Sequence, residues 1–173
     1  MSILRVGMDE LDESWAVMLM AASERAAMQG REDVAEYLRL KATNDAIRAA
    51  GVKWLLDAFA EIAFKQGNAT IKVEREERHS FKHGVSTMAG TRLTIRYGVR
   101  CLDIEAGWAR TPSHGIMRQG ALAQANILHF GRSRENETLK LIHGDDLPRW
   151  ILSADSVFHL DDVARHVGLL LAD

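Results

Sequence analysis

The chain has 173 residues, of which 47% are hydrophobic and 27% are charged, and its formal net charge is −2. This size and composition indicate a single folded domain with a real core and exclude a disordered protein. The sequence has no apolar run near the roughly 20 residues that a membrane span needs, and its start lacks the apolar region of a signal peptide. We therefore expect a cytoplasmic protein with no membrane contact.

The first 68 residues are predicted to be helical. Residues 9–29 form one helix and residues 32–66 continue as a second helical stretch, which contains Gly51. Because glycine inside a helix costs about 1 kcal/mol relative to alanine, we expect either one long helix or two helices broken between residues 44 and 51. The apolar residues at helical spacing in the first helix are Leu11, Trp15, Met18, Leu19 and Ala22.

From Ala69 onward the hydrophobic pattern changes to a period of two, which predicts strands. Residues 70–82 resemble a charged edge strand. Residues 91–108 predict a hairpin with a type II′ turn at Gly98-Val99, because glycine suits the first position of that turn. The pairing then sets Ile95 opposite Leu102 and Leu93 opposite Ile104, while a bulge within one long strand is the alternative.

The rest of the chain alternates between loops and short strands. Residues 107–120 are predicted to be a long loop, and residues 122–131 suit a strand although their alanines also allow a helix. Residues 138–143 and 149–152 are further strands, and residues 161–171 form a last helix.

The order of these elements predicts an α+β fold. We expect an N-terminal helical hairpin packed on an antiparallel β-meander of four to six strands, followed by a C-terminal helix. Within one domain of residues 1–173, the helical part covers 1–68, the sheet 69–153 and the last helix 154–173.

Charge is distributed unevenly over these parts. Residues 69–132 contain 10 Lys and Arg against 5 Asp and Glu, whereas residues 1–68 contain 8 against 11 and residues 133–173 contain 4 against 8. A basic sheet between acidic helical flanks indicates a protein that accepts an anionic small molecule or an acidic partner.

The 107–120 loop is the best candidate for a site, because long loops inside compact domains are often functional. Its arginines suit a phosphate or carboxylate group, which they grip through paired hydrogen bonds. The expected ligand-binding residues are Trp108, Arg110, Ser113, His114 and Arg118.

Other chemistry has weaker support. His79 and His83 form an H-x-x-x-H pair on a predicted strand rather than a helix, so we expect no metal site. Cys101 is the only cysteine, which excludes an internal disulfide, and we expect it to be a small buried apolar residue. The glycine-rich motifs of nucleotide sites are absent, so we expect no cofactor. The aromatic residues of the basic segment are too few for nucleic-acid binding.

The predicted first helix is apolar over more of its circumference than a one-sided surface helix needs, which predicts a homodimer through the N-terminal helices. The leading interpretation is a binding domain that accepts its ligand on the basic sheet and the 107–120 loop. Two alternatives stay open. One is a small cofactor-independent enzyme with His114 as general acid or base, and the other is a structural or assembly subunit.

Overall fold

The computed structural model describes residues 8–67, 69–115, 117 and 120–172. The contacts divide the chain after Ala50 into two compact units, and the boundary falls inside helix α2 (Glu32–Gln66). We describe each unit by itself. The expectation of one domain stays a prediction.

The first unit is a helical hairpin made of α1 (Met8–Met28) and the first part of α2. Gly30 links the two helices with φ of 73°, a left-handed conformation that glycine adopts without strain. The predicted first helix is confirmed. The predicted apolar stripe is only partly right, because Leu19 is buried whereas Trp15 and Met18 are 44% and 62% exposed. The side chain of Leu11 lies outside the described residues.

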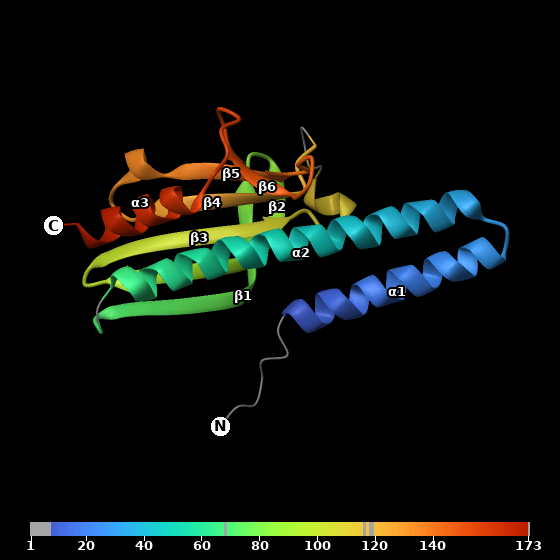
Figure 1. Ribbon diagram of the computed structural model, residues 1–173, viewed down its shortest axis with the longest axis horizontal. Helices are drawn as coiled ribbons and strands as arrows, with labels where there is room; N and C mark the ends of the chain where they lie inside the picture. Colours follow the sequence, from blue (N-terminus) through green and yellow to red (C-terminus); the bar gives the residue numbers. More distant parts are fainter. Residues whose placement is uncertain (1–7, 68, 116, 118–119, 173) are drawn as a thin grey trace, which may run out of the picture. The chain divides into compact units, whose positions relative to one another are not determined.

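The second unit is built on one six-stranded antiparallel sheet in the order β1-β2-β3-β4-β5-β6, so the predicted α+β meander is confirmed (Figure 1). Two short 3₁₀ turns, at Pro112–His114 and Ser133–Glu135, lie between strands, and helix α3 (Leu160–Leu171) closes the chain. The strands are β1 (Ile71–His83), β2 (Ser86–Tyr97), β3 (Arg100–Trp108), β4 (Ala123–His129), β5 (Glu137–Ile142) and β6 (Arg149–Leu152).

The predicted hairpin between β2 and β3 is confirmed residue by residue. Ile95 pairs with Leu102 and Leu93 pairs with Ile104. Gly98 has φ of 61°, the sign that a type II′ turn requires at its first position. The strand alternative for residues 122–131 is also confirmed, since β4 occupies Ala123–His129.

Strand β1 differs from a regular strand at one point. Its pairing with β2 shifts between Glu76 and His79, as at a β-bulge. The shift moves His79 to the face opposite Ile71 and Val73. A single unbroken strand would have kept these three residues on one face, so the sequence pattern misplaced His79.

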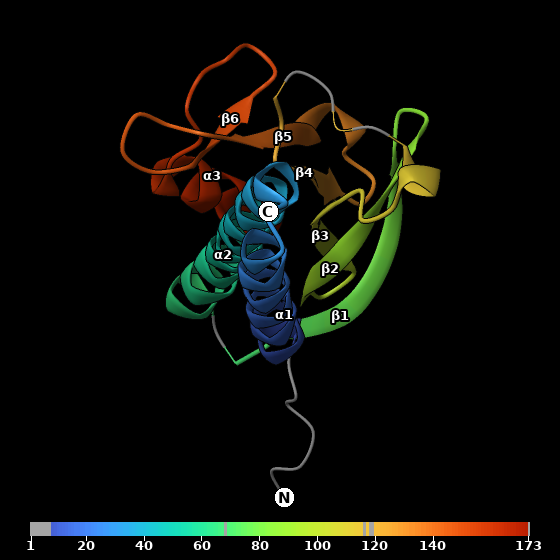
Figure 2. The same cartoon turned by 90° about the vertical axis from the view of Figure 1, so that its right-hand side faces the viewer.

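One face of the sheet is covered by the later part of α2, from Gly51 onward, and by α3 (Figure 2). Helix α2 is continuous through Gly51, and the structure explains why glycine stands there. A Cβ atom at Gly51 would lie 2.4 Å from Leu141 Cδ2, and the Gly51 carbonyl accepts a hydrogen bond of 3.0 Å from Trp150 Nε1. The glycine therefore lets the helix approach the sheet closely.

Candidate functional site

The candidate site lies on the other face of the sheet, which the later part of α2 and α3 leave uncovered. The strand register places one row of residues across this face, from β1 to β6. In order they are His79, Gly90, Gly107, Gln124, Lys140 and Ile151. Because successive side chains of a strand point to opposite faces, these six residues share a face although they are far apart in the sequence.

Two glycines in the middle of this row keep the face open. Gly90 and Gly107 are directly paired, and a Cβ atom would lie 1.9 Å from Ala106 O at Gly90 and 2.4 Å from Ala89 O at Gly107. No larger residue fits either position without moving the backbone. The row therefore has no side chain between His79 and Gln124.

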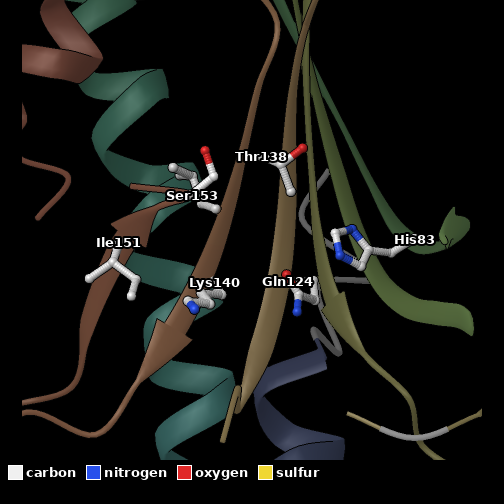
Figure 3. Close-up of a pocket in the computed structure, with 7 residues that line it drawn as sticks. His83, Gln124, Thr138, Lys140, Ile151 and Ser153 are labelled. Atoms are coloured by element: carbon white, nitrogen blue, oxygen red, sulfur yellow. The ribbon is translucent and has the colours of Figure 1, made fainter. Parts of the chain in front are cut away.

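A small pocket lies beside the glycine pair, with a volume of about 170 Å³. Figure 3 shows His83 on the side of the β1–β2 hairpin, pointing towards Gln124 and Thr138 across the pocket. Five of the seven lining residues have polar side chains, and the lining comes from β1, β4, β5, β6 and the residue that follows β6. It consists of His83, Gln124, Thr138, Leu139, Lys140, Ile151 and Ser153.

Two of these residues carry most of the hydrogen-bonding capacity. Gln124 is 8% exposed and belongs to the central strand β4. The side chain of Lys140 is 20% exposed. Its ammonium group lies 3.5 Å from the carboxylate of Asp155, whose side chain is 78% exposed. The pocket thus combines one positive charge with an amide and hydroxyl groups.

A chain of hydrogen bonds runs along the neighbouring row and reaches the pocket at Thr138. His79 Nε2 lies 2.7 Å from Glu105 Oε2, and Asn126 Nδ2 donates to Glu105 Oε1 at 3.0 Å. The Thr138 hydroxyl lies 3.5 Å from Asn126 Oδ1. Since both oxygens of Glu105 have partners, these contacts fix the polar wall next to the pocket.

The residues predicted in the 107–120 loop lie elsewhere. Trp108 is buried, and the guanidinium carbon of Arg110 lies 3.9 Å from the centre of its ring, a cation–π contact. The backbone N–H of Arg110 donates to His114 Nδ1 at 3.4 Å, and the hydroxyl groups of Thr111 and Ser113 are 2.8 Å apart. Arg110 thus contacts both Trp108 and His114, whereas Ser113 contacts Thr111.

Arg118 lies outside the described residues. The loop lies close to the hairpin that carries His83. A Cβ atom at Gly115 would lie 2.5 Å from Ser86 Oγ, and Ser86 pairs with His83. This close approach packs the loop against the wall of the pocket.

Sequence reasoning missed Gln124, Lys140 and Ser153, and it considered His83 only as a metal ligand. Two glycines inside strand patterns were the available signal, since such glycines often mark a close approach of backbones. Within the described part of the chain there is no group of three or more His, Cys, Asp or Glu that could hold a metal ion. Cys101 is half-buried, and burial raises the pKa of its thiol, with Asp103 adding to the effect.

A second polar cluster lies on the helix-covered side of the sheet. His129 Nε2 is 2.8 Å from His166 Nδ1, and His166 Nε2 is 2.9 Å from Glu137 Oε2. Burial, followed by the neighbouring His166, lowers the pKa of His129 to about 4. Burial also lowers the pKa of His166, although Glu137 opposes that shift.

Both imidazoles of this cluster are therefore neutral at pH 7. Because the carboxylate of Glu137 accepts a hydrogen bond, His166 carries its hydrogen on Nε2 and accepts from His129 through Nδ1. The rings of Phe59 and Phe158 lie against His166, each with its centre 6.2 Å from that of the imidazole, and His166 is fully buried. The cluster is a part of the core rather than a ligand site.

A comparison with protein-family models, curated proteins and solved structures finds no match for this chain. Among the described residues, every helix is too short or too polar to cross a membrane. Function must therefore be inferred from the geometry of the sheet and its pocket.

Proposed function

We propose that this protein is a binding domain that accepts an oxyanion, the carboxylate or phosphate group of a small ligand, in the pocket beside the glycine pair. The observation that carries the proposal is that Lys140, Gln124 and Ser153 all line one hollow of the sheet. A positive charge beside amide and hydroxyl donors is the combination that binds an oxyanion.

The ion pair of Lys140 with Asp155 does not prevent this use. The carboxylate of Asp155 is largely in water and lies 3.5 Å from the ammonium group, a distance longer than that of a charge-assisted hydrogen bond. An oxyanion in the pocket would compete with this carboxylate for the lysine.

The size of the pocket limits what it takes. Pockets for drug-sized ligands have volumes of about 300–1,000 Å³, whereas a cavity of about 150 Å³ holds a single benzene ring. At about 170 Å³, this pocket has room for one carboxylate or phosphate group and a few carbon atoms. Ile151 supplies apolar surface for those carbons. A larger ligand would place only its anionic end here.

Binding is a better account of this site than catalysis. The carboxylate–imidazole pair of Glu105 and His79 near the pocket has little capacity left, because Glu105 accepts from both His79 and Asn126. In the loop, His114 Nδ1 is taken up by the Arg110 backbone, and the Arg110 guanidinium lies over Trp108. These contacts favour a supporting role for the loop over the general acid–base role of the enzyme alternative.

The test is isothermal titration calorimetry of the full chain with sodium phosphate and with sodium acetate, each at fixed ionic strength. Lys140→Met removes the charge and keeps the length of the side chain. We expect it to weaken binding of the preferred anion by tenfold or more, since a hydrogen bond to a charged group contributes about 1.5–3 kcal/mol. Gln124→Leu should weaken binding several-fold.

Two control variants locate the site. Lys72→Met removes an exposed lysine from β1, outside the pocket lining, and should leave the affinity unchanged. Arg110→Met should also leave it unchanged. Equal affinity in wild type and Lys140→Met would contradict the proposal. The absence of any heat of binding with both phosphate and acetate would contradict it too. Loss of binding in Arg110→Met alone would place the ligand in the loop.

A further inference from the structure

The turn that follows β6 places a negative charge beside the lysine of the pocket. Asp155 Oδ1 lies 3.5 Å from Lys140 Nζ. Asp155 is also the one non-glycine residue in the described part of the chain with a positive φ, of 60°. Aspartate and asparagine adopt this left-handed conformation more readily than other side chains. The turn therefore presents a carboxylate next to the pocket at a position where glycine is the usual choice.

Backbone hydrogen bonds fix the turn that carries this carboxylate. The Asp155 N–H donates to Leu152 O at 2.9 Å, and the Leu152 N–H donates to Ser156 O at 2.8 Å. A bridge between Ile151 and Val157 closes the turn. Because a lining residue of the pocket, Ser153, belongs to the same turn, Asp155 lies close to any ligand that the pocket holds.

Positive charge is scarce around the pocket. Lys140 is the one Lys or Arg among the described residues that line it. Two carboxylates lie nearby, Asp155 on the turn and Glu105, 13% exposed, in the neighbouring row of the sheet. Arg149 faces the same side of the sheet, two residues before Ile151, but it does not line the pocket. This balance of charges suits an anion that carries a single charge.

A carboxylate and a phosphate differ in this respect. A carboxylate carries one negative charge at neutral pH, whereas a phosphate monoester carries close to two, because its second pKa is about 6. Lys140 balances the first charge of either ligand. The described lining residues offer no second Lys or Arg for the other charge, which comes to lie near Asp155. Taking a charge out of water without a partner is costly.

The donors of the pocket also suit a planar group with two oxygens. Gln124 and Lys140 are directly paired on β4 and β5, so their Cβ atoms lie about 5 Å apart on one face. An amide N–H and an ammonium group at this spacing can reach the two oxygens of one carboxylate. Ile151 pairs with Lys140 from the other side and is 4% exposed. It offers the apolar surface that a short alkyl chain needs.

We propose that the pocket binds a short aliphatic monocarboxylate in preference to a phosphate, and that Asp155 sets this preference by repelling the second charge of a dianion. The proposal rests on the proposed function, since it names the anion that the same pocket accepts. Butyrate is near the upper size, because it has as many non-hydrogen atoms as the benzene ring that a cavity of about 150 Å³ holds.

Isothermal titration calorimetry of the full chain at pH 7.5 and low ionic strength tests the proposal with acetate, methyl phosphate and dimethyl phosphate. Acetate and dimethyl phosphate carry one charge, and methyl phosphate carries close to two. We expect wild type to bind acetate at least tenfold more tightly than methyl phosphate. A chain-length series should gain about two- to fourfold in affinity for each methylene group from acetate to butyrate.

Asp155→Asn removes the charge and keeps a residue that tolerates the positive φ. It should tighten acetate and dimethyl phosphate about threefold each and methyl phosphate about tenfold. The reason is that each charge of the ligand loses one repulsion across roughly 6 Å of water. Added salt should reduce these gains, since it screens exposed charges. A change in the shape of the turn alone would not follow the charge of the ligand.

Two further variants serve as controls. Asp161→Asn removes the same charge from the first turn of α3, on the opposite face of the sheet, and should change no affinity. His83→Gln removes the other lining residue that can carry a proton, and it should keep the preference for acetate.

Tighter binding of methyl phosphate than of acetate by wild type would overturn the proposal. Equal gains for methyl phosphate and dimethyl phosphate in Asp155→Asn would overturn it too. In both cases a loss of binding in Lys140→Met would leave the proposed function standing. Absence of heat with all three probes would refute the proposed function itself, and this proposal with it.

Discussion

The two units of this chain bury their apolar residues in opposite ways. The second unit has a core of large side chains, among them the fully buried Phe59, Leu55 and Ile104, although Phe64 and Phe130 are exposed. In the first unit alanines and a serine occupy the helix contact, while Met28, Tyr37 and Leu40 face outward. The second unit therefore contains most of the large buried apolar side chains of the described residues.

This difference also separates the proposed roles. The second unit fixes the pocket by the register of its strands, so its side chains are held in position before a ligand arrives. The hairpin offers an adaptable surface rich in methionine, which suits protein contact more than small-molecule binding. The proposed binding site then belongs to the second unit alone.

The largest expected effect comes from truncating a buried leucine of the second unit, with an exposed leucine of the first unit for comparison. Leu55→Ala and Leu40→Ala remove the same atoms from the same helix, but Leu55 is fully buried and Leu40 is 59% exposed. Leu55→Ala should lower the free energy of unfolding by about 2–5 kcal/mol. Leu40→Ala should lower it by no more than about 0.5 kcal/mol at concentrations where the chain is monomeric. Urea unfolding measures both, and equal losses would erase the contrast between the units.

Acid should weaken the second unit through its buried histidine pair. The folded pKa of His129 is about 4, below the value of about 6.5 for histidine in an unfolded chain, so the unfolded state takes up the proton first as the pH falls. Stability is therefore fully present above pH 6.5 and is lost between pH 6.5 and pH 4, by on the order of 3 kcal/mol.

Urea unfolding at pH 7.5 and pH 4.5 measures this loss, and the lowered pKa of His166 adds to it in the same direction. His129→Gln removes one titrating group, so it should show a smaller difference between the two pH values than wild type. An identical pH dependence in both proteins would show that the histidine pair does not control acid stability.

A smaller effect should follow from two glycine substitutions within the second unit. Gly90→Ala forces a Cβ atom to within 1.9 Å of Ala106 O, so the strands must separate and stability should fall by about 1–3 kcal/mol. Gly168→Ala on α3 meets no atom within 4 Å and should raise stability by about 0.5–1 kcal/mol. Thermal unfolding gives both signs. A stabilised Gly90→Ala would contradict the close approach of β2 and β3.

The smallest predicted effect concerns the end of α3. Arg132 Nη1 donates to Leu169 O at 3.0 Å, and Arg100 Nη1 donates to Leu170 O at 3.3 Å, so two strand-end arginines satisfy carbonyl groups in the last turn of the helix. Arg132→Ala should cost about 1 kcal/mol, because that carbonyl then depends on water. Arg134→Ala is the control, since Arg134 is exposed on the same turn. The two variants should differ in unfolding midpoint; identical midpoints would remove Arg132 from the cap.

The sequence predicted those parts of the fold that depend on neighbours in the chain. The β2–β3 hairpin follows from Gly98 and the alternation on either side of it, and its register came out correctly. The β1 bulge was not predicted, because a register shift depends on the partner strand and changes the alternation of apolar residues only slightly. Gly51 allowed a break in α2 to be predicted, but the helix is continuous there. The glycine is required by the close approach of Leu141, which lies 90 residues later in the sequence.

The sequence did not predict the pocket, for a related reason. Its residues come from four segments that meet only when the sheet is in register, and none of them forms a motif with its sequence neighbours. The excess of basic residues pointed to the sheet, yet several of those arginines have partners within the unit. Arg75 pairs with Asp57 and Glu77, and Arg92 pairs with Glu76. Composition counts charges without showing which ones are already neutralised.

The most direct test of the proposed pocket is a nuclear magnetic resonance titration of the full chain with phosphate and with acetate, following every assigned backbone amide. We expect the shifts to concentrate at Gln124, Thr138, Lys140 and Ser153, with the amides of α1 unchanged. Shifts confined to the hairpin or to residues 109–115, or none with either anion, would contradict the proposed site.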